Sequence, residues 1–161
     1  MMLRNAYSFT KVGMDATNAG NTAEQRHKDG KKGGKQDAFR HTYWQALNTQ
    51  DAGEKYARDF SDSHEYPTPS NETNDILMDI HNNDVGIEIG KNNPNASPEE
   101  LQKIIDDKMK NGDLIIMDKN GNLTKSNGEP VDNSKTRRSE KAKEISIDIK
   151  NNRINNGYED Y

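Results

Sequence analysis

The chain has 161 residues, a formal net charge of -4, 29% hydrophobic and 31% charged residues, and a mean hydropathy of -1.22. These values fit one domain with a small core, and the absence of any apolar run of about 18 residues excludes a membrane-spanning helix. Cysteine is absent, which excludes disulfides and thiolate metal sites.

The first 34 residues are rich in Gly, Asn, Lys and Thr and end in HKDGKKGGK. We expect them to form an extended polar lead-in, with at most a short helix around Ala23–His27. The Gly/Lys cluster lacks the spacing of a phosphate-binding loop, and no apolar strand precedes it. The sequence therefore predicts a solvated connector here.

Apolar residues then recur at helical spacing, for example Phe39, Tyr43 and Leu47. Pro67 and Pro69 enforce an extended break further along the chain. Three helices are predicted on this basis, over residues 36–48, 52–63 and 71–92. Gly86 and Gly90 inside the third indicate either a close approach to a neighbouring element or an early end of the helix.

A fourth helix is predicted over residues 97–111 from its capping signals. Ser97, Pro98 and Glu100 stand at the N-cap, first and third helical positions. Two short apolar runs around Asn120-Gly121 then predict a β-hairpin.

The expected fold is mainly α: about four core helices, one hairpin after the fourth helix, and polar flexible ends. The expected organisation is a lead-in over residues 1–34, a helical core with hairpin over 35–130, and a charged helix or tail over 131–161.

Three of the four histidines lie on, or at the end of, the three central helices. They are His41, His64 and His81, and each has polar neighbours in the sequence. Helices in contact lie about 8–10 Å apart, so side chains on three successive helices can meet. We expect at least two of the three imidazoles to converge at a solvent-reachable pocket, with Glu65 or Asp79 at its wall.

Such a cluster supports two kinds of chemistry. Three imidazoles with Glu65 and Asp79 are compatible with a divalent metal that polarises a water. Without metal, one histidine can act as general base and another as general acid, with Arg40 stabilising an anionic transition state. Alternatively, each histidine is a hydrogen-bonded core residue without catalytic function. Asp37 and His41, four residues apart, either pair to orient the imidazole or make a surface contact.

Four stretches of the sequence together resemble a module at the C-termini of large bacterial surface and secreted proteins. The stretches are GKQDAFRHTYWQAL, SDSHEY, MDIHNNDVGIEIG and NPNASPEELQKIIDDKMKNGDLIIMDKNGNL. The module occurs in haemagglutinin-like contact-dependent inhibition proteins and other polymorphic toxins. The resemblance covers about residues 34–123 and implies a functional cluster, namely Arg40, His41, His64, Glu65, Asp79, His81 and Asn82.

The resemblance implies a soluble toxin domain that is secreted or delivered into a target bacterium as the C-terminal part of a larger protein. It also implies a cognate immunity protein as partner. We expect a hydrolase that acts on a phosphodiester, RNA being the favoured substrate. Arg40, His41, His64, Glu65 and His81 are the expected catalytic residues, and Trp44, Asp79 and Asn82 the expected substrate contacts. The alternatives are a phospholipase-like metal-dependent hydrolase and a non-catalytic binding or adaptor module.

Overall fold

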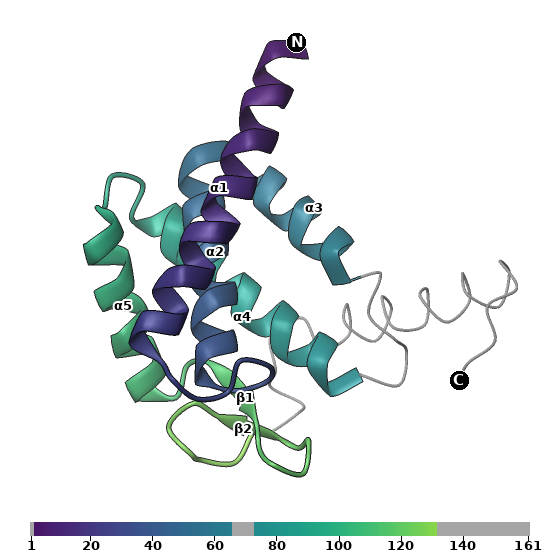
Figure 1. Cartoon of the computed structure of the whole chain (residues 1–161), viewed down its shortest axis with the longest axis vertical. Helices are drawn as coiled ribbons and strands as arrows, with labels where there is room; N and C mark the ends of the chain where they lie inside the picture. Colours follow the sequence, from purple (N-terminus) through teal and green to yellow (C-terminus); the bar gives the residue numbers. More distant parts are fainter. Residues whose placement is uncertain (1, 66–72, 132–161) are drawn as a thin grey trace, which may run out of the picture.

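The computed structural model describes the backbone of residues 2–65 and 73–131, and the side chains of residues 11–63 and 74–131. Five helices are followed by two short strands (Figure 1). The helices are α1 (Met2–Arg26), α2 (Lys35–Ala52), α3 (Glu54–Glu65), α4 (Thr73–Asn92) and α5 (Pro98–Asn111), and the strands are β1 (Ile115–Met117) and β2 (Leu123–Lys125). Within the described residues, no helix combines the length and the apolar composition needed to cross a membrane.

The helix α2 lies at the centre of the fold and contacts the other four helices and β1. Its most extensive neighbour is α4. The two helices run in the same direction, since Gly86 lies against Thr42 and Gly90, one turn later, lies against Ala46. Two glycines of α4 allow the close approach. A Cβ atom on Gly86 would lie 2.2 Å from the carbonyl oxygen of Thr42, and one on Gly90 would lie 2.5 Å from that of Ala46. Of the two interpretations of these glycines, close approach is therefore confirmed.

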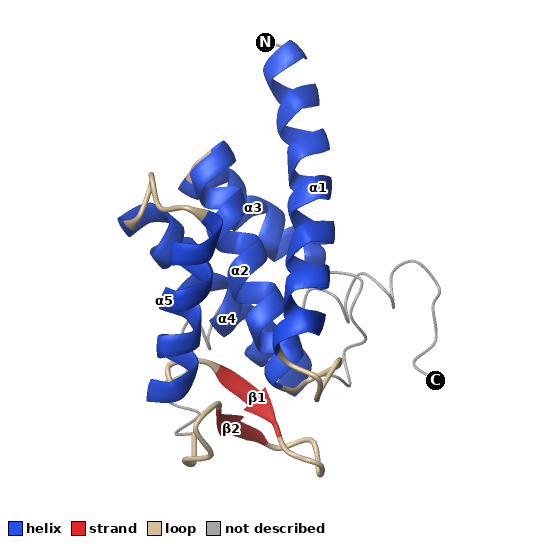
Figure 2. Ribbon diagram, turned by 60° about the vertical axis from the view of Figure 1, so that its left-hand side comes forward, coloured by secondary structure: helices blue, strands red, loops and turns tan. Residues whose placement is uncertain are grey.

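The predicted helical fold with one terminal hairpin is confirmed (Figure 2). The capping box at Ser97 is present: its side chain accepts from the backbone N–H of Glu100, and the Glu100 carboxylate accepts from the N–H of Ser97. The hairpin turns at the expected place, where Gly121 adopts a φ of +79°. The predicted C-terminal helix or tail lies beyond Val131, outside the described residues. The predicted break at Pro67–Pro69 also lies outside the described residues.

The prediction of an extended lead-in is wrong, because residues 2–26 form the long helix α1. It packs along α2 through small side chains at helical spacing: Val12, Ala19 and Ala23 are buried, and Ala16 packs against the core. The indole N–H of Trp44 donates to the carbonyl oxygen of Val12 at 3.1 Å. Alanine contributes little hydropathy, which is why this apolar stripe is faint in the sequence.

Asp15 is a buried carboxylate of α1 that is linked to the end of α2 through Lys11. The Lys11 ammonium lies 3.5 Å from Asp15 and 3.1 Å from Asp51 of α2. Burial, together with the hydrogen bond and the charge of Asp51, raises the pKa of Asp15 to about 6 against the opposing charge of Lys11. Asp15 therefore binds a proton more tightly in the folded protein than in the unfolded chain.

The free energy of unfolding should consequently fall as pH rises from about 4 to about 6, because the folded state holds the Asp15 proton across that window. Asp15→Asn should remove this part of the pH dependence and leave the protein more stable than the wild type at about pH 7. Urea unfolding at about pH 4.5 and about pH 7 measures both effects. An unchanged difference between the two pH values in Asp15→Asn would contradict the assignment.

Candidate functional site

Four ionisable side chains meet where the first half of α2 lies against α4. Asp37, Arg40 and His41 come from α2, and Asp79 comes from α4. The Nε2 atom of His41 lies 3.5 Å from an oxygen of Asp37 and 3.4 Å from Oδ1 of Asp79. The spacing of three and four residues places the α2 members on one helix face. We call these four residues the His41 cluster.

The hydrogen bonds of His41 define which ring nitrogen carries the proton. A guanidinium can only donate, and Nη2 of Arg40 lies 2.8 Å from Nε2, so Nε2 is the acceptor. Nδ1 then carries the hydrogen and donates to Oδ1 of Asn83 at 3.3 Å. Since His41 is 5% exposed, these contacts fix the ring with Nε2 directed at Arg40 and close to the two carboxylates.

The environment shifts the pKa values of His41 and Asp79 in opposite directions. Burial, followed by the charge of Arg40, lowers the pKa of His41 to about 4, which makes it neutral at physiological pH. Burial, followed by the charge of Asp37, raises the pKa of Asp79 well above its usual range. Opposite shifts in adjacent groups are frequent at functional sites.

The cluster holds more carboxylates than cations. Asp37 forms an ion pair with Arg40 and also accepts from the backbone N–H of Gly33 at 2.7 Å. Asp75 pairs with Lys32 at 3.0 Å. Oδ1 of Asp79 is buried and, among the described residues, makes no hydrogen bond. Asp79 thus lies beside two ion pairs, and within the described part of the chain its close contact with a basic side chain is the one with the neutral His41.

The cluster is partly open to solvent. The side chain of Asp79 is 18% exposed, and that of Arg40 is 37% exposed. Asp37, His41 and Asp79 each offer one donor atom, and these atoms lie within 4.8 Å of one another. Such a set can hold a metal ion, and it can also bind and polarise a water.

Two of the expected catalytic residues, Arg40 and His41, are brought together with Asp79, but His81 is not part of this group. The Nε2 atom of His81 lies 2.8 Å from the carbonyl oxygen of Asp113, after α5. His81 lines a cavity of about 530 Å³ between α4, α5 and the hairpin. It follows Asp79 by two residues, so its side chain leaves α4 on a different face. His41 does not line this cavity, so His41 and His81 are not a converging pair, and the expected convergence of two imidazoles now depends on His64.

Asn82 and Trp44 have structural contacts instead of the expected contacts with substrate. The Asn82 side chain donates to the carbonyl oxygen of Ile115 at 2.8 Å and accepts from the N–H of Ile115 at 3.0 Å, which anchors β1 to α4. Trp44 is 6% exposed and packs edge-on against Phe60 of α3. Burial of both side chains explains why neither is available to a substrate.

His64 and Glu65 end α3, and their side chains lie outside the described residues. The direction of α3 nevertheless places this end of the helix. Glu54 pairs with Lys91 and Arg58 with Asp84, so α3 runs antiparallel to α4. The last turn of α3 is therefore directed toward the first half of α4 (Figure 1), and Asp79 belongs to that half of the helix.

The sequence offers the pair Asn82-Asn83 either as hydrogen-bond donors to a substrate or as a kink or cap, and only Asn82 is an expected site residue. In the structure Asn83 is 1% exposed and contacts His41. The signal that finds it is the spacing of four residues between Asp79 and Asn83, which places both on the α4 face that meets α2. Asp37 was noted only as a possible partner of His41, and the interpretation as a surface contact is wrong because Asp37 is 4% exposed.

The comparisons with known proteins give one family. Residues 1–113 match the family described as Domain of unknown function (DUF6973). The chain belongs to this family. Neither the curated proteins nor the solved structures contain a match. The matched residues include α1 and the whole His41 cluster, so both are parts of the family domain.

Proposed function

We propose that the chain is a hydrolase that cleaves a phosphodiester, and that it acts as a delivered antibacterial effector with a cognate immunity protein. The observation that carries the hydrolase proposal is the His41 cluster. It combines an uncharged imidazole, two carboxylates within 3.5 Å of its Nε2 atom, and a partly exposed guanidinium that donates to the same atom. The effector context rests on the resemblance of the sequence to toxin modules.

Phosphodiester hydrolysis requires an acceptor for the proton of the attacking water and positive charge near the phosphate oxygens. Asp37, His41 and Asp79 supply the acceptor atoms, and Arg40 supplies the charge. The water oxygen forms a bond to phosphorus, the bond from phosphorus to the leaving oxygen breaks, and that oxygen receives a proton. We propose His64, at the end of α3, as the donor of this last proton, and Glu65 remains the sequence-based candidate for its partner.

RNA is favoured over phospholipid by the apolar surface of the protein. Enzymes that work at a lipid surface present exposed apolar side chains to it. Among the described side chains, Met14 on α1 is the exposed large hydrophobic residue. It does not belong to the His41 cluster, which comes from α2 and α4. A phosphodiester in a water-soluble chain fits this surface better.

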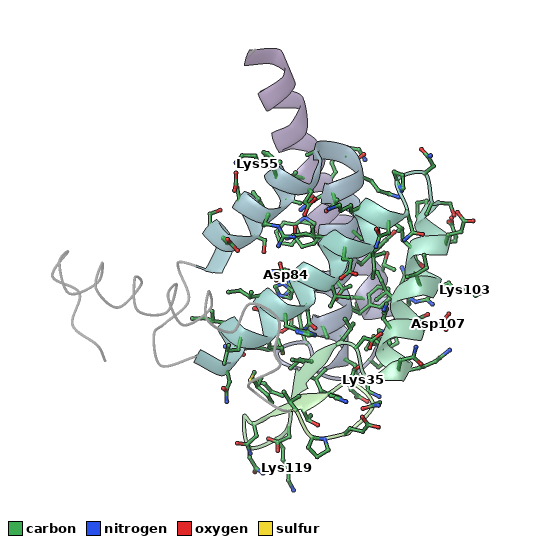
Figure 3. The ribbon with its side chains drawn as sticks, turned by 180° about the vertical axis from the view of Figure 1, so that it is seen from behind. Lys35, Lys55, Asp84, Lys103, Asp107 and Lys119 are labelled. Atoms are coloured by element: carbon green, nitrogen blue, oxygen red, sulfur yellow. The ribbon has the colours of Figure 1, made fainter. Side chains whose placement is uncertain are left out.

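The test is cleavage of a fluorescently labelled RNA by the purified protein, read on a denaturing gel. We expect cleavage by the wild type, and a rate about 100-fold lower for Arg40→Gln, the typical cost of losing one charge-stabilising donor. Lys103→Gln is the matched control, because Lys103 lies on the outer side of α5 (Figure 3). It should cleave at the wild-type rate.

Parallel reactions use DNA and vesicles of phosphatidylethanolamine and phosphatidylglycerol. Cleavage of the lipid alone would replace RNA with phospholipid as substrate and keep the hydrolase. No cleavage of any of the three would overturn the hydrolase proposal and favour a binding module.

A further inference from the structure

We infer that Asp37, His41 and Asp79 form a binding site for a divalent transition-metal ion. The inference deepens the proposed function by naming the cofactor of the same site, although metal binding can be tested without any substrate. Two observations support it: the tautomer of His41 and the unbonded oxygen of Asp79.

The His41 tautomer is the one that a metal ligand requires. Histidine ligands commonly donate their second ring N–H to a fixed acceptor, which orients the ring and leaves the other nitrogen for the metal. In His41 the fixed acceptor is Oδ1 of Asn83 at 3.3 Å, and the lone pair is on Nε2. Asn83 is 1% exposed, so its position is set by packing. We therefore assign Asn83 as a positioning residue for His41.

The unbonded oxygen of Asp79 points to the same place. Oδ1 of Asp79 is buried and lies 3.4 Å from Nε2 of His41, which carries no hydrogen to donate. Nε2 itself accepts from Arg40, so the atom left without a donor is Oδ1 of Asp79, and a buried carboxylate oxygen in this state costs free energy unless a cation or a proton lies beside it. A divalent ion coordinated by both atoms and by Asp37 removes this cost.

The distances suit such an ion after a small movement. Ligand atoms at about 2.1 Å from one ion lie about 3–4 Å apart. Nε2 of His41 is already 3.5 Å from Asp37 and 3.4 Å from Asp79, and all three donors lie within 4.8 Å. Imidazole with two carboxylates suits Mn²⁺ or Zn²⁺. Three protein ligands also leave a coordination position for water.

Arg40 occupies two of these ligands in the structure. Its guanidinium donates to Asp37 and to Nε2 of His41, so a metal ion must displace it. The side chain is 37% exposed and can move outward without breaking the core. Released from the carboxylate, it becomes available to a phosphate oxygen. Metal binding and the proposed role of Arg40 are thus coupled.

The test is titration of the EDTA-treated protein with MnCl₂ and with ZnCl₂. Binding is measured by calorimetry for both ions and, for Mn²⁺, by the loss of the free-ion signal in electron paramagnetic resonance. We expect one ion per chain. Asp79→Asn and His41→Gln should abolish binding, and Asn83→Leu should weaken it about 10- to 100-fold, as for other residues that orient a ligand. Asn83→Asp retains the acceptor and should restore it.

Asp107→Asn is the matched control, because it removes an exposed carboxylate from the outer side of α5 and should bind as the wild type (Figure 3).

Arg40→Lys should bind Mn²⁺ several-fold more tightly, since it keeps the charge but loses the planar group that bridges two ligands. Lys32→Gln removes a nearby charge that pairs with Asp75, and it should change the affinity less. Circular dichroism of each variant confirms folding.

Absence of binding by the wild type, or binding that persists in both Asp79→Asn and His41→Gln, would overturn the metal site. RNA cleavage in excess EDTA would show that the metal ion is not needed for catalysis, and the proposed hydrolase activity would still hold. Metal binding without cleavage of any phosphodiester would instead remove the proposed function and leave the metal site.

Discussion

Replacing Asp79 with Asn should give a protein that is more stable and inactive. Burial and the charge of Asp37 disfavour the ionised form of Asp79, and its Oδ1 has no hydrogen bond among the described residues. The amide has similar size without the charge. We expect the free energy of unfolding of the metal-free protein to rise by about 1 kcal/mol, while phosphodiester cleavage falls at least about 100-fold.

Growth of a bacterial host provides the second measurement on the same variant. Expression of the wild type in the cytoplasm without an immunity protein should arrest growth, and Asp79→Asn should relieve the arrest at equal protein level. His64→Ala should also relieve it. A variant that is destabilised as well as inactive would make Asp79 a structural residue. A wild type that is harmless in both cytoplasm and periplasm would count against the effector proposal.

Replacing Gly86 with Ala should be the most destabilising single-methyl change in the described core. The new Cβ would lie 2.2 Å from the backbone oxygen of Thr42 and 3.0 Å from the side chain of Gln45. A backbone oxygen in the centre of α2 cannot rotate away, so α2 and α4 must separate. We expect a loss of about 3 kcal/mol, the upper end for overpacking a core, and a Tm lower by about 6–12 °C.

Gly13→Ala is the matched control for this prediction. Gly13 is also inside a helix, but nothing lies within 4 Å of the position of its Cβ. Alanine should therefore stabilise α1 by about 0.5–1 kcal/mol through its helix propensity. Thermal unfolding of the two variants measures both effects. Equal Tm values for Gly86→Ala and the wild type would show that α2 and α4 are not as closely packed as described.

The four central and C-terminal helices could be predicted because their signals are local. Ser97, Pro98 and Glu100 form a capping box within four residues, and the apolar side chains are large enough to mark their helical period. The helix α1 could not be predicted in the same way. Its buried face consists mainly of alanines, and the feature that stabilises it is the distant contact with Trp44 and α2.

The site could be predicted only in part, for a related physical reason. The resemblance to the toxin module implied that Arg40, His41 and Asp79 belong to one cluster, but the sequence could not decide which face of α4 meets α2. Gly86 determines that face, because a helix can approach closely only where side chains are absent. Asp79 and Asn83 share the Gly86 face and meet His41. His81 and Asn82 are turned toward Asp113 and β1 instead.

The central claim is that chemistry takes place at His41 and not at the cavity lined by His81. The most direct measurement compares initial rates of RNA cleavage by His41→Gln and His81→Gln. The two changes are identical, and glutamine at position 81 can still donate to the Asp113 carbonyl. We expect a rate about 100- to 10,000-fold lower for His41→Gln and a rate within a few-fold of wild type for His81→Gln. A large loss in His81→Gln with His41→Gln still active, both proteins being folded, would contradict it.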